Sequence, residues 1–169
     1  AKGKDLSHVL IFASSIKSVK EITQTLNRSG MRASDMHSGL DQQQREDTIR
    51  DFKNKKIRIL VATDILSRGI DIKGIELVIN YEVPHDAEDY VHRIGRTARA
   101  DRTGEAITFI NQKQVRNFLD IEKLIEKEVP KLDLPKGFEE APTYKVNPKS
   151  NKKKQWNNKR KFNKPNAPK

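Results

Sequence analysis

Short apolar segments alternate with amphipathic segments along most of the chain. Residues 8–13, 57–62, 76–81 and 104–110 are apolar runs rich in β-branched side chains, as is typical of buried parallel strands, and residues 31–36 fit a further short strand. The segments between them carry apolar residues at helical spacing. Strands that alternate with helices predict βαβ units, so we expect a three-layer α/β/α domain with a mostly parallel sheet covered on both faces.

Several polar residues mark where the predicted helices begin and end. Ser14 or Ser15 can cap a helix that follows the first strand, and Gly30 stands where a C-cap glycine belongs. Asp41 and Gln44 have the spacing of a capping box. Asp86 opens a third helical segment, and a long closing helix is predicted from Val115 onward.

The composition changes sharply near the C-terminus. We predict a globular domain over residues 1–129, a linker over 130–146 and a basic low-complexity tail over 147–169, which has too few large apolar side chains to build a core. The net charge of the chain is +11, and ten lysines and arginines after Glu140 leave only +1 for the rest. A polycation of this kind attracts nucleic acid through counterion release.

Other features of the composition exclude whole classes of protein. The chain has no cysteine, which rules out disulfides, thiolate zinc sites and cysteine nucleophiles. It has no apolar run of the roughly 20 residues that a membrane span needs. A predicted strand begins only a few residues from the N-terminus, so we expect the chain to be a piece of a longer protein, and a natural start with its Met removed is the alternative.

Two segments concentrate chemistry-bearing residues. The first, V-A-T-D-I-L-S-R-G-I-D-I over 61–72, leaves a buried strand and fits either a phosphate and ribose contact or an ordinary strand exit with an Arg–Asp pair. The second, Y-V-H-R-I-G-R-T-A-R over 90–99, places three arginines at every third position. Three guanidiniums fit either a solvated basic face or a triphosphate, whose spreading charge arginine stabilises during phosphoryl transfer.

Taken together, these segments resemble motifs V and VI of the DEAD-box RNA helicases. Residues 9–15 resemble motif IV and residues 37–47 the motif IVa region, so the resemblance covers about residues 6–127. It implies the C-terminal RecA-like domain of an ATP-dependent RNA helicase. Within the family, the chain resembles the RhlE-like branch, whose members often carry basic tails.

The resemblance implies a role for individual residues. Arg96 and Arg99 resemble the catalytic arginine fingers that reach the γ-phosphate of ATP, and Arg93 resembles an interdomain or motif-linking arginine of the nucleotide site. Gly69 and Asp71 resemble the ribose contact. Contacts to the RNA backbone are implied for Ser15, Ser38, Gly39, Arg45 and Thr63, while Arg68 fits either an RNA contact or a brace at the domain interface.

One position departs from the family pattern. Ser38 stands where the family usually has glycine after the histidine, and Gly39 follows it. Either the loop is shifted by one residue, or Ser38 makes the phosphate contact. The tail suits salt-dependent RNA binding with base stacking, through Lys152, Lys153, Lys154, Trp156, Arg160 and Lys161. The alternative is a tail that only keeps the protein soluble.

The chain lacks a G-x-x-x-x-G-K-[S/T] phosphate loop and a D-E-A-D tetrad. We therefore expect ATP, with its Mg²⁺, to be held mainly by an N-terminal RecA-like domain, and this chain alone to lack ATPase activity. The expected partners are that domain and RNA of little sequence specificity, in a cytoplasmic protein without a membrane partner. One alternative is a non-enzymatic RNA-binding or annealing module. The other is a DNA helicase, and the pattern H-R-I-G-R-T argues against that second alternative.

Overall fold

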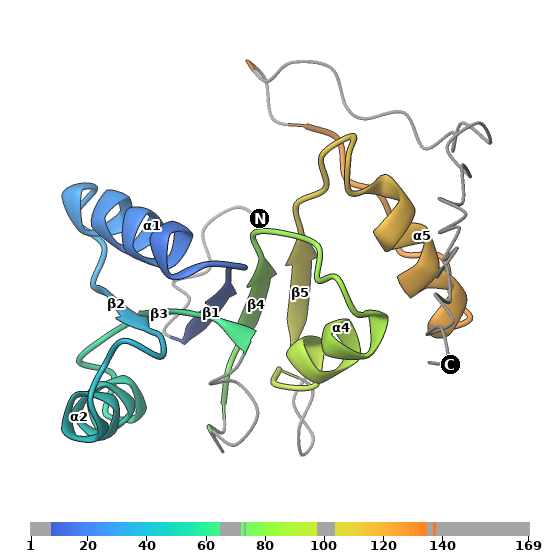
Figure 1. The fold of residues 1–169 in the computed structure, drawn as a ribbon. Helices are drawn as coiled ribbons and strands as arrows, with labels where there is room; N and C mark the ends of the chain where they lie inside the picture. The colour runs from blue at the N-terminus through green and yellow to red at the C-terminus, as the bar shows by residue number, and fades with distance from the viewer. Residues whose placement is uncertain (1–7, 65–71, 73, 98–103, 135–136, 138–169) are drawn as a thin grey trace, which may run out of the picture.

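The computed structural model describes residues 8–64, 72, 74–97, 104–134 and 137 (Figure 1). Its elements are, in chain order, β1 (Val9–Phe12), α1 (Ile16–Arg28), β2 (Ala33–Met36), α2 (Gln42–Lys53), β3 (Ile59–Ala62), β4 (Leu77–Asn80), α4 (Ala87–Ile94), β5 (Glu105–Thr108) and α5 (Val115–Leu124). Every strand predicted from the sequence is present, each a few residues shorter than its apolar run. The closing helix spans 10 residues and is shorter than we expected.

The five strands form one sheet in the order β2-β3-β1-β4-β5, and all four pairings are parallel. This confirms the predicted α/β fold with a parallel sheet. Parallel strands place their carboxyl ends at the same edge of a sheet, where ligands of such folds usually bind. Here Phe12 pairs with Ala62 and with Asn80, and Met36 pairs with Ala62, so four of these ends lie in line.

Apolar side chains cover both faces of the sheet. On one face Leu10, Phe12, Leu60, Ala62 and Val78 pack with Met36, Phe52, Ile72 and Ile75. On the other face Val9, Ile11, Val61 and Leu77 pack with Val19 of α1. The strict alternation along β1 explains why its run is apolar at every position. A third cluster, of Val83, Tyr90, Phe118 and Ile121, joins α4 to α5.

The helix ends follow the capping residues in the sequence. Ser15, rather than Ser14, is the N-cap of α1, and its hydroxyl accepts a hydrogen bond from the Ser18 amide at 3.1 Å. Gly30 has a φ of 78°, and Met31 N donates to Leu26 O at 3.0 Å, as at a glycine-terminated helix. Asp41 and Gln44 form the predicted capping box, and Asp86 caps α4. These predictions are confirmed, and they fix where each helix starts relative to the sheet edge.

Hydrogen bonds connect the segment after α5 to that helix. The Glu122 carboxylate accepts from Val129 N at 2.8 Å and from Lys131 Nζ at 2.6 Å. Lys131 is itself partly desolvated, which lowers its pKa, but the carboxylates of Glu122 and Glu128 outweigh this and raise the pKa overall. The domain, linker and tail boundaries stay predictions. None of the helices in the described part of the chain has the length and apolar character needed to cross a membrane.

Candidate functional site

Most of the predicted site residues that the structure describes lie just beyond the strands, at the carboxyl edge of the sheet. Ser15 follows β1, Ser38 and Gly39 follow β2, and Thr63 follows β3. Because β2, β3 and β1 are neighbours in the sheet, these residues lie along the same edge. We call Ser15, Ser38, Gly39, Arg45 and Thr63 the open edge.

Thr63 is the one residue of the open edge that is buried. Its side chain is 8% exposed, and its amide donates to Met36 O at 3.2 Å. Its hydroxyl oxygen is buried and makes no hydrogen bond to any described residue. Leaving a buried hydroxyl without a partner costs free energy, so such atoms are rare unless a ligand or water completes them.

The loop after β2 is shaped by a buried histidine. His37 is 2% exposed, its Nδ1 accepts from the Gly39 amide at 3.1 Å, and its Nε2 lies 3.0 Å from Asp35 Oδ2. A Cβ atom on residue 39 would lie 3.1 Å from His37 Nδ1, so a glycine suits this close approach. Since His37 takes the Gly39 amide, Ser38 is the better candidate for the predicted phosphate contact.

Arg45 reaches this loop from α2. Its Nη2 donates to Ser38 O at 3.1 Å, while its Nε is buried and has no hydrogen-bond partner among the described residues. One edge of the guanidinium therefore holds the loop in place. The buried Nε of Arg45 is, after the Thr63 hydroxyl, a second polar atom of the open edge without a hydrogen-bond partner among the described residues.

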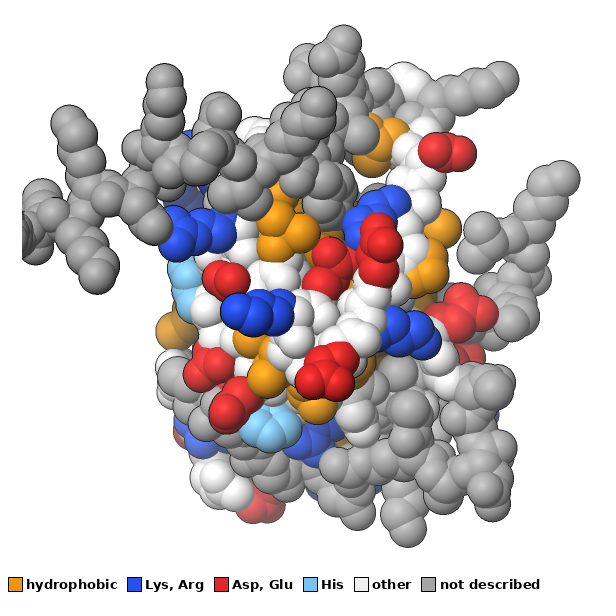
Figure 2. Space-filling model, turned by 90° about the vertical axis from the view of Figure 1, so that its right-hand side faces the viewer, with side chains coloured by type: hydrophobic (Ala, Val, Ile, Leu, Met, Phe, Trp, Pro, Cys, Tyr) orange, Lys and Arg blue, Asp and Glu red, His pale blue; other side chains and the backbone are white. Residues whose placement is uncertain are grey.

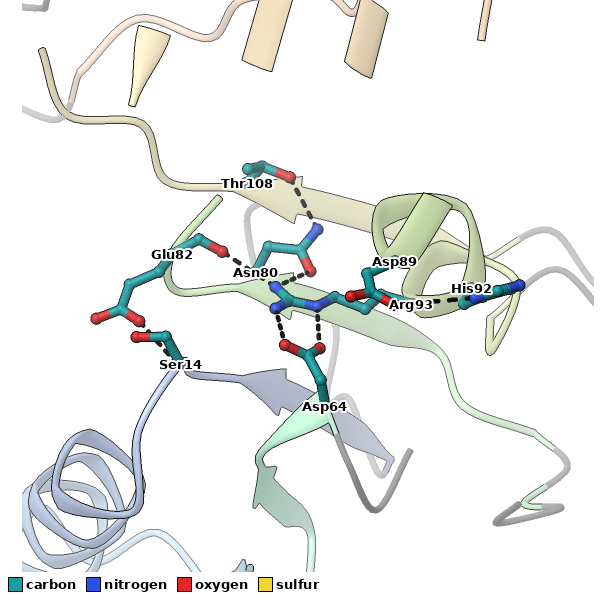
Figure 3. A network of polar contacts seen from close by, with 8 residues as sticks. All are labelled: Ser14, Asp64, Asn80, Glu82, Asp89, His92, Arg93 and Thr108. Carbon is teal, nitrogen blue, oxygen red and sulfur yellow. Dashed lines mark hydrogen bonds and ion pairs between the residues drawn. The ribbon is translucent and has the colours of Figure 1, made fainter. Parts of the chain in front are cut away.

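Arg93 organises a different group of residues (Figure 3). It is 1% exposed, and its Nε and Nη2 donate to the two carboxylate oxygens of Asp64 at 2.6 and 2.7 Å. Its Nη1 donates to Asn80 Oδ1 at 3.2 Å and to Glu82 O at 3.0 Å. We call Arg93, Asp64, Asn80 and Glu82 the paired edge. A charge buried this deeply needs such a complete set of partners.

The paired edge continues into β5 and α4. Asn80 is fully buried, and its Nδ2 donates to Thr108 Oγ1 at 3.0 Å. Burial raises the pKa of Tyr90 above its usual value; a hydrogen bond with Thr108 opposes this shift, and the negative charge of Glu122 adds to it. The chain of contacts from Asp64 to Tyr90 thus crosses three strands and reaches α4.

Arg96 lies at the end of α4 and is half-buried. Its side chain lines a small cavity with Phe12, Ala62, Ile72 and Ile75. Thr97, which is 6% exposed, donates to Ile75 O at 2.9 Å and so fixes the turn from which Arg96 projects. The stem of Arg96 therefore rests on the apolar core beside β1 and β3, and this turn holds the backbone of a predicted finger in place.

Several predicted residues lie outside the described part of the chain. They are Gly69, Asp71, Arg68 and Arg99 and, in the tail, Lys152, Lys153, Lys154, Trp156, Arg160 and Lys161. Arg93, which we placed in the nucleotide site, is buried within the paired edge in this structure. It links the segment 61–72 to the segment 90–99, and a nucleotide contact by its side chain stays a prediction.

Sequence reasoning passed over three members of the paired edge. Asp64 follows Thr63 directly and was not named as a site residue. Asn80 is a fully buried amide at the end of an otherwise apolar strand, which is a usable signal, because buried polar side chains need partners. Glu82 carries no comparable signal in the sequence.

The described surface on the α5 side of the molecule is mixed in charge. Figure 2 shows acidic and basic side chains interspersed there with hydrophobic ones. The excess positive charge of the chain lies instead after Glu140 in the sequence. Within the described residues, no group of three or more His, Asp and Glu side chains is placed to hold a metal ion.

Comparison with known proteins gives a consistent result. Residues 3–101 match the family model of the helicase conserved C-terminal domain. The chain is 43% identical over 120 residues to the ATP-dependent RNA helicase dbp8 of Emericella nidulans, covering 71% of this chain and 23% of that protein. It thus spans about a quarter of the length of the curated relatives it matches.

Two solved structures extend this similarity to the fold. A DEAD box protein from Methanococcus jannaschii is 43% identical, with a TM-score of 0.73 over 78% of this chain and 36% of that one. Dbp5 of S. cerevisiae, bound to RNA and ADP BeF3, is 35% identical, with a TM-score of 0.65 over 70% of this chain and 32% of that one. None of these three proteins points to the RhlE branch, so that branch stays a prediction.

Proposed function

Because the chain belongs to the helicase conserved C-terminal domain family, as the C-terminal domain of a DEAD-box RNA helicase, we propose that it forms one wall of an ATP-driven RNA clamp. Its open edge binds the RNA backbone. The end of α4 supplies arginines to ATP held by an N-terminal RecA-like domain. Closure of the two domains would distort the bound strand and so unwind or remodel short RNA duplexes.

The observation that carries this proposal is the buried hydroxyl of Thr63, which has no partner among the described residues. It lies at the same sheet edge as Ser15 and Ser38, which follow β1 and β2, and Arg45 adds positive charge there. Hydroxyls and arginines are the usual donors to phosphate oxygens. Contacts of this kind recognise the sugar-phosphate backbone, so we expect little preference for RNA sequence.

The arginines that follow α4 in the sequence suit a polyphosphate by their chemistry. Arg96 and Arg99 offer planar guanidiniums that bind phosphate oxygens in pairs. ATP would supply the free energy that drives closure and reopening, and the N-terminal domain would hold its Mg²⁺. In this proposal the chain positions Arg96 through the Thr97–Ile75 hydrogen bond. Its Gly69 and Asp71 would contact the ribose of ATP.

Since neither a phosphate loop nor a D-E-A-D tetrad occurs in the 169 residues, we expect the chain alone to hydrolyse ATP negligibly. The tail would add a salt-dependent grip on RNA through its lysines and arginines, with Trp156 and Phe162 available to stack on bases. RhlE-like membership is part of this proposal, because basic tails are frequent in that branch.

The test replaces the Thr63 hydroxyl without changing its shape. Thr63→Val should weaken binding of single-stranded oligouridine roughly 5–10-fold, the equivalent of one hydrogen bond of about 1–1.5 kcal/mol. The same variant should be as stable as the parent, or more so, because the hydroxyl it removes has no partner to lose. Fluorescence anisotropy, at salt high enough to weaken the tail, measures the first effect, and urea unfolding measures the second.

Thr23→Val is the matched control. Thr23 is equally buried, at 8% exposed, but its hydroxyl already donates to Val19 O at 2.8 Å. This variant should keep the RNA affinity of the parent. Equal RNA affinities for the Thr63 variant and the parent would argue against an RNA contact at the open edge.

A further inference from the structure

Glu82 makes two contacts in opposite directions from the end of β4. Its backbone oxygen accepts from Arg93 Nη1 at 3.0 Å. Its carboxylate Oε2 accepts from the Ser14 amide at 2.7 Å (Figure 3). One residue therefore touches the buried arginine of α4 and the turn that leads from β1 into α1.

The placement of Glu82 reflects where the sheet ladder ends. Tyr81 N donates to Phe12 O at 2.9 Å, so the two strands run side by side up to that point. Glu82 is the first residue beyond it, and its half-buried side chain crosses to the neighbouring turn. The described structure pairs its carboxylate with a backbone amide, and a charged acceptor makes that hydrogen bond stronger than a neutral one would.

The turn that Glu82 holds is part of the open edge. Ser14 precedes Ser15, the N-cap of α1, whose hydroxyl already accepts from the Ser18 amide. Asp64, the other main partner of Arg93, directly follows Thr63. Two of the predicted RNA contacts therefore lie next to this network: Ser15 directly follows Ser14, which Glu82 holds, and Thr63 directly precedes Asp64 of the paired edge.

We propose that Glu82 is a positioning residue that couples Arg93, the centre of the paired edge, to the proposed RNA-binding turn at Ser14 and Ser15. Movement of α4 when nucleotide is engaged shifts the Glu82 backbone, and the carboxylate carries that shift to the Ser14 amide. This inference rests on the proposed function, because it needs RNA at the open edge and nucleotide beside α4.

The charge of Glu82 argues against a role in RNA binding itself. A carboxylate at the start of α1 repels a phosphate that approaches the same helix end. Its loss would thus remove repulsion while it loosens the turn, and these two effects oppose each other. We therefore expect RNA affinity without nucleotide to change by less than about threefold.

The experiment measures coupling, which is the factor by which nucleotide changes RNA affinity. The protein is the helicase in which this chain follows its nucleotide-binding domain, the RNA is a fluorescent oligouridine decamer, and the nucleotide is ADP with beryllium fluoride. Glu82→Ala should reduce the coupling factor at least fivefold. Glu82→Gln keeps an acceptor for the Ser14 amide and should restore more than half of the loss. Glu128→Ala changes an exposed acid after α5 and should behave as the parent.

Two results would overturn the inference. In one, Glu82→Ala keeps the parental coupling factor. In the other, both Glu82 variants lower RNA affinity equally with and without nucleotide, in step with a lower melting temperature, which indicates a structural role only. Failure of the proposed function is a separate result: the parent protein would then show no RNA binding that depends on Thr63.

Discussion

The two parts of the sheet edge differ in how completely their polar atoms are paired. On the paired edge, Arg93 is almost fully buried and donates to Asp64, Asn80 and Glu82. On the open edge, buried atoms of Thr63 and Arg45 have no hydrogen-bond partner among the described residues. The two edges meet after β3, where Thr63 and Asp64 are consecutive, but Ser15, Ser38 and Gly39 of the open edge are exposed, whereas Arg93 and Asn80 of the paired edge are buried.

The difference reflects how much free energy each edge would lose if its polar atoms had no partner within the chain. A buried guanidinium without partners would cost several kcal/mol, so the fold must satisfy Arg93 within the chain. The hydroxyl of Thr63 costs less to leave unpaired, roughly 1–3 kcal/mol, and a folded domain can tolerate it. The paired edge therefore sets the geometry of α4, whereas the open edge is where we propose that RNA binds.

The largest effect is expected at Arg96, which follows α4 and is the described arginine of the proposed finger pair. Arg96→Ala, in the helicase that includes the N-terminal domain, should lower RNA-stimulated ATP hydrolysis about 10³-fold, as loss of an arginine finger does in related phosphoryl-transfer systems. RNA binding without nucleotide should stay close to that of the parent, since the open edge is untouched. Steady-state ATPase and anisotropy assays measure the two effects, and near-normal turnover would refute the finger.

The next largest effect is on stability, at Arg93. Arg93→Ala leaves the Asp64 carboxylate and the buried Asn80 without their donor, and it should lower the free energy of unfolding by about 3 kcal/mol. Arg116→Ala, at an exposed position on α5, should stay within about 0.5 kcal/mol of the parent. Urea unfolding of the 169-residue chain measures both variants. A change below about 1 kcal/mol at Arg93 would mean that the paired edge is not a scaffold.

Removing the tail sharpens the comparison, because it isolates the open edge. Deletion of residues 145–169, which are the tail and the last two residues of the linker, takes away ten positive charges. It should weaken RNA binding by an order of magnitude or more at low salt, with a flatter salt dependence. In the truncated protein, Thr63→Val should remove a larger fraction of the remaining free energy of RNA binding. Anisotropy titrations between low and moderate salt test this. Unchanged affinity at low salt would exclude the tail from RNA binding.

The smallest effect concerns the far end of the paired edge. The raised pKa of Tyr90 means that the unfolded chain loses its phenol proton first, near pH 10. Above that pH the unfolded state holds fewer protons than the native state. The contribution of Tyr90 to the free energy of unfolding is therefore intact below pH 10 and declines as the pH rises through the pKa of Tyr90 in the folded state. Tyr90→Phe should be less sensitive to alkali than the parent between pH 9 and 11. Unfolding midpoints across that range, with exposed Tyr81→Phe as control, measure this.

Much of the fold was predictable because its signals are local. The apolar runs, the Asp41–Gln44 box and Gly30 each act within a few residues, and the structure bears them out. Strand lengths were overestimated, since apolar residues continue past the last paired position. Among the site residues, Ser15, Thr63 and Arg45 were named from the family pattern, whereas Asn80 and Glu82 were missed because their partners are distant in the sequence.

The sequence by itself determined the order of strands and helices, the capping of the helices and the separation of a nearly neutral body from a basic tail. These follow from periodicity and composition, which involve only neighbouring residues. Only the tertiary structure decided that Arg93 faces inward to Asp64 and Asn80, that His37 takes the amide of Gly39, and that Thr63 keeps a buried hydroxyl open. The reason is that pairing of buried polar atoms depends on which strand ends meet in the sheet, and that meeting is set by packing across the whole domain.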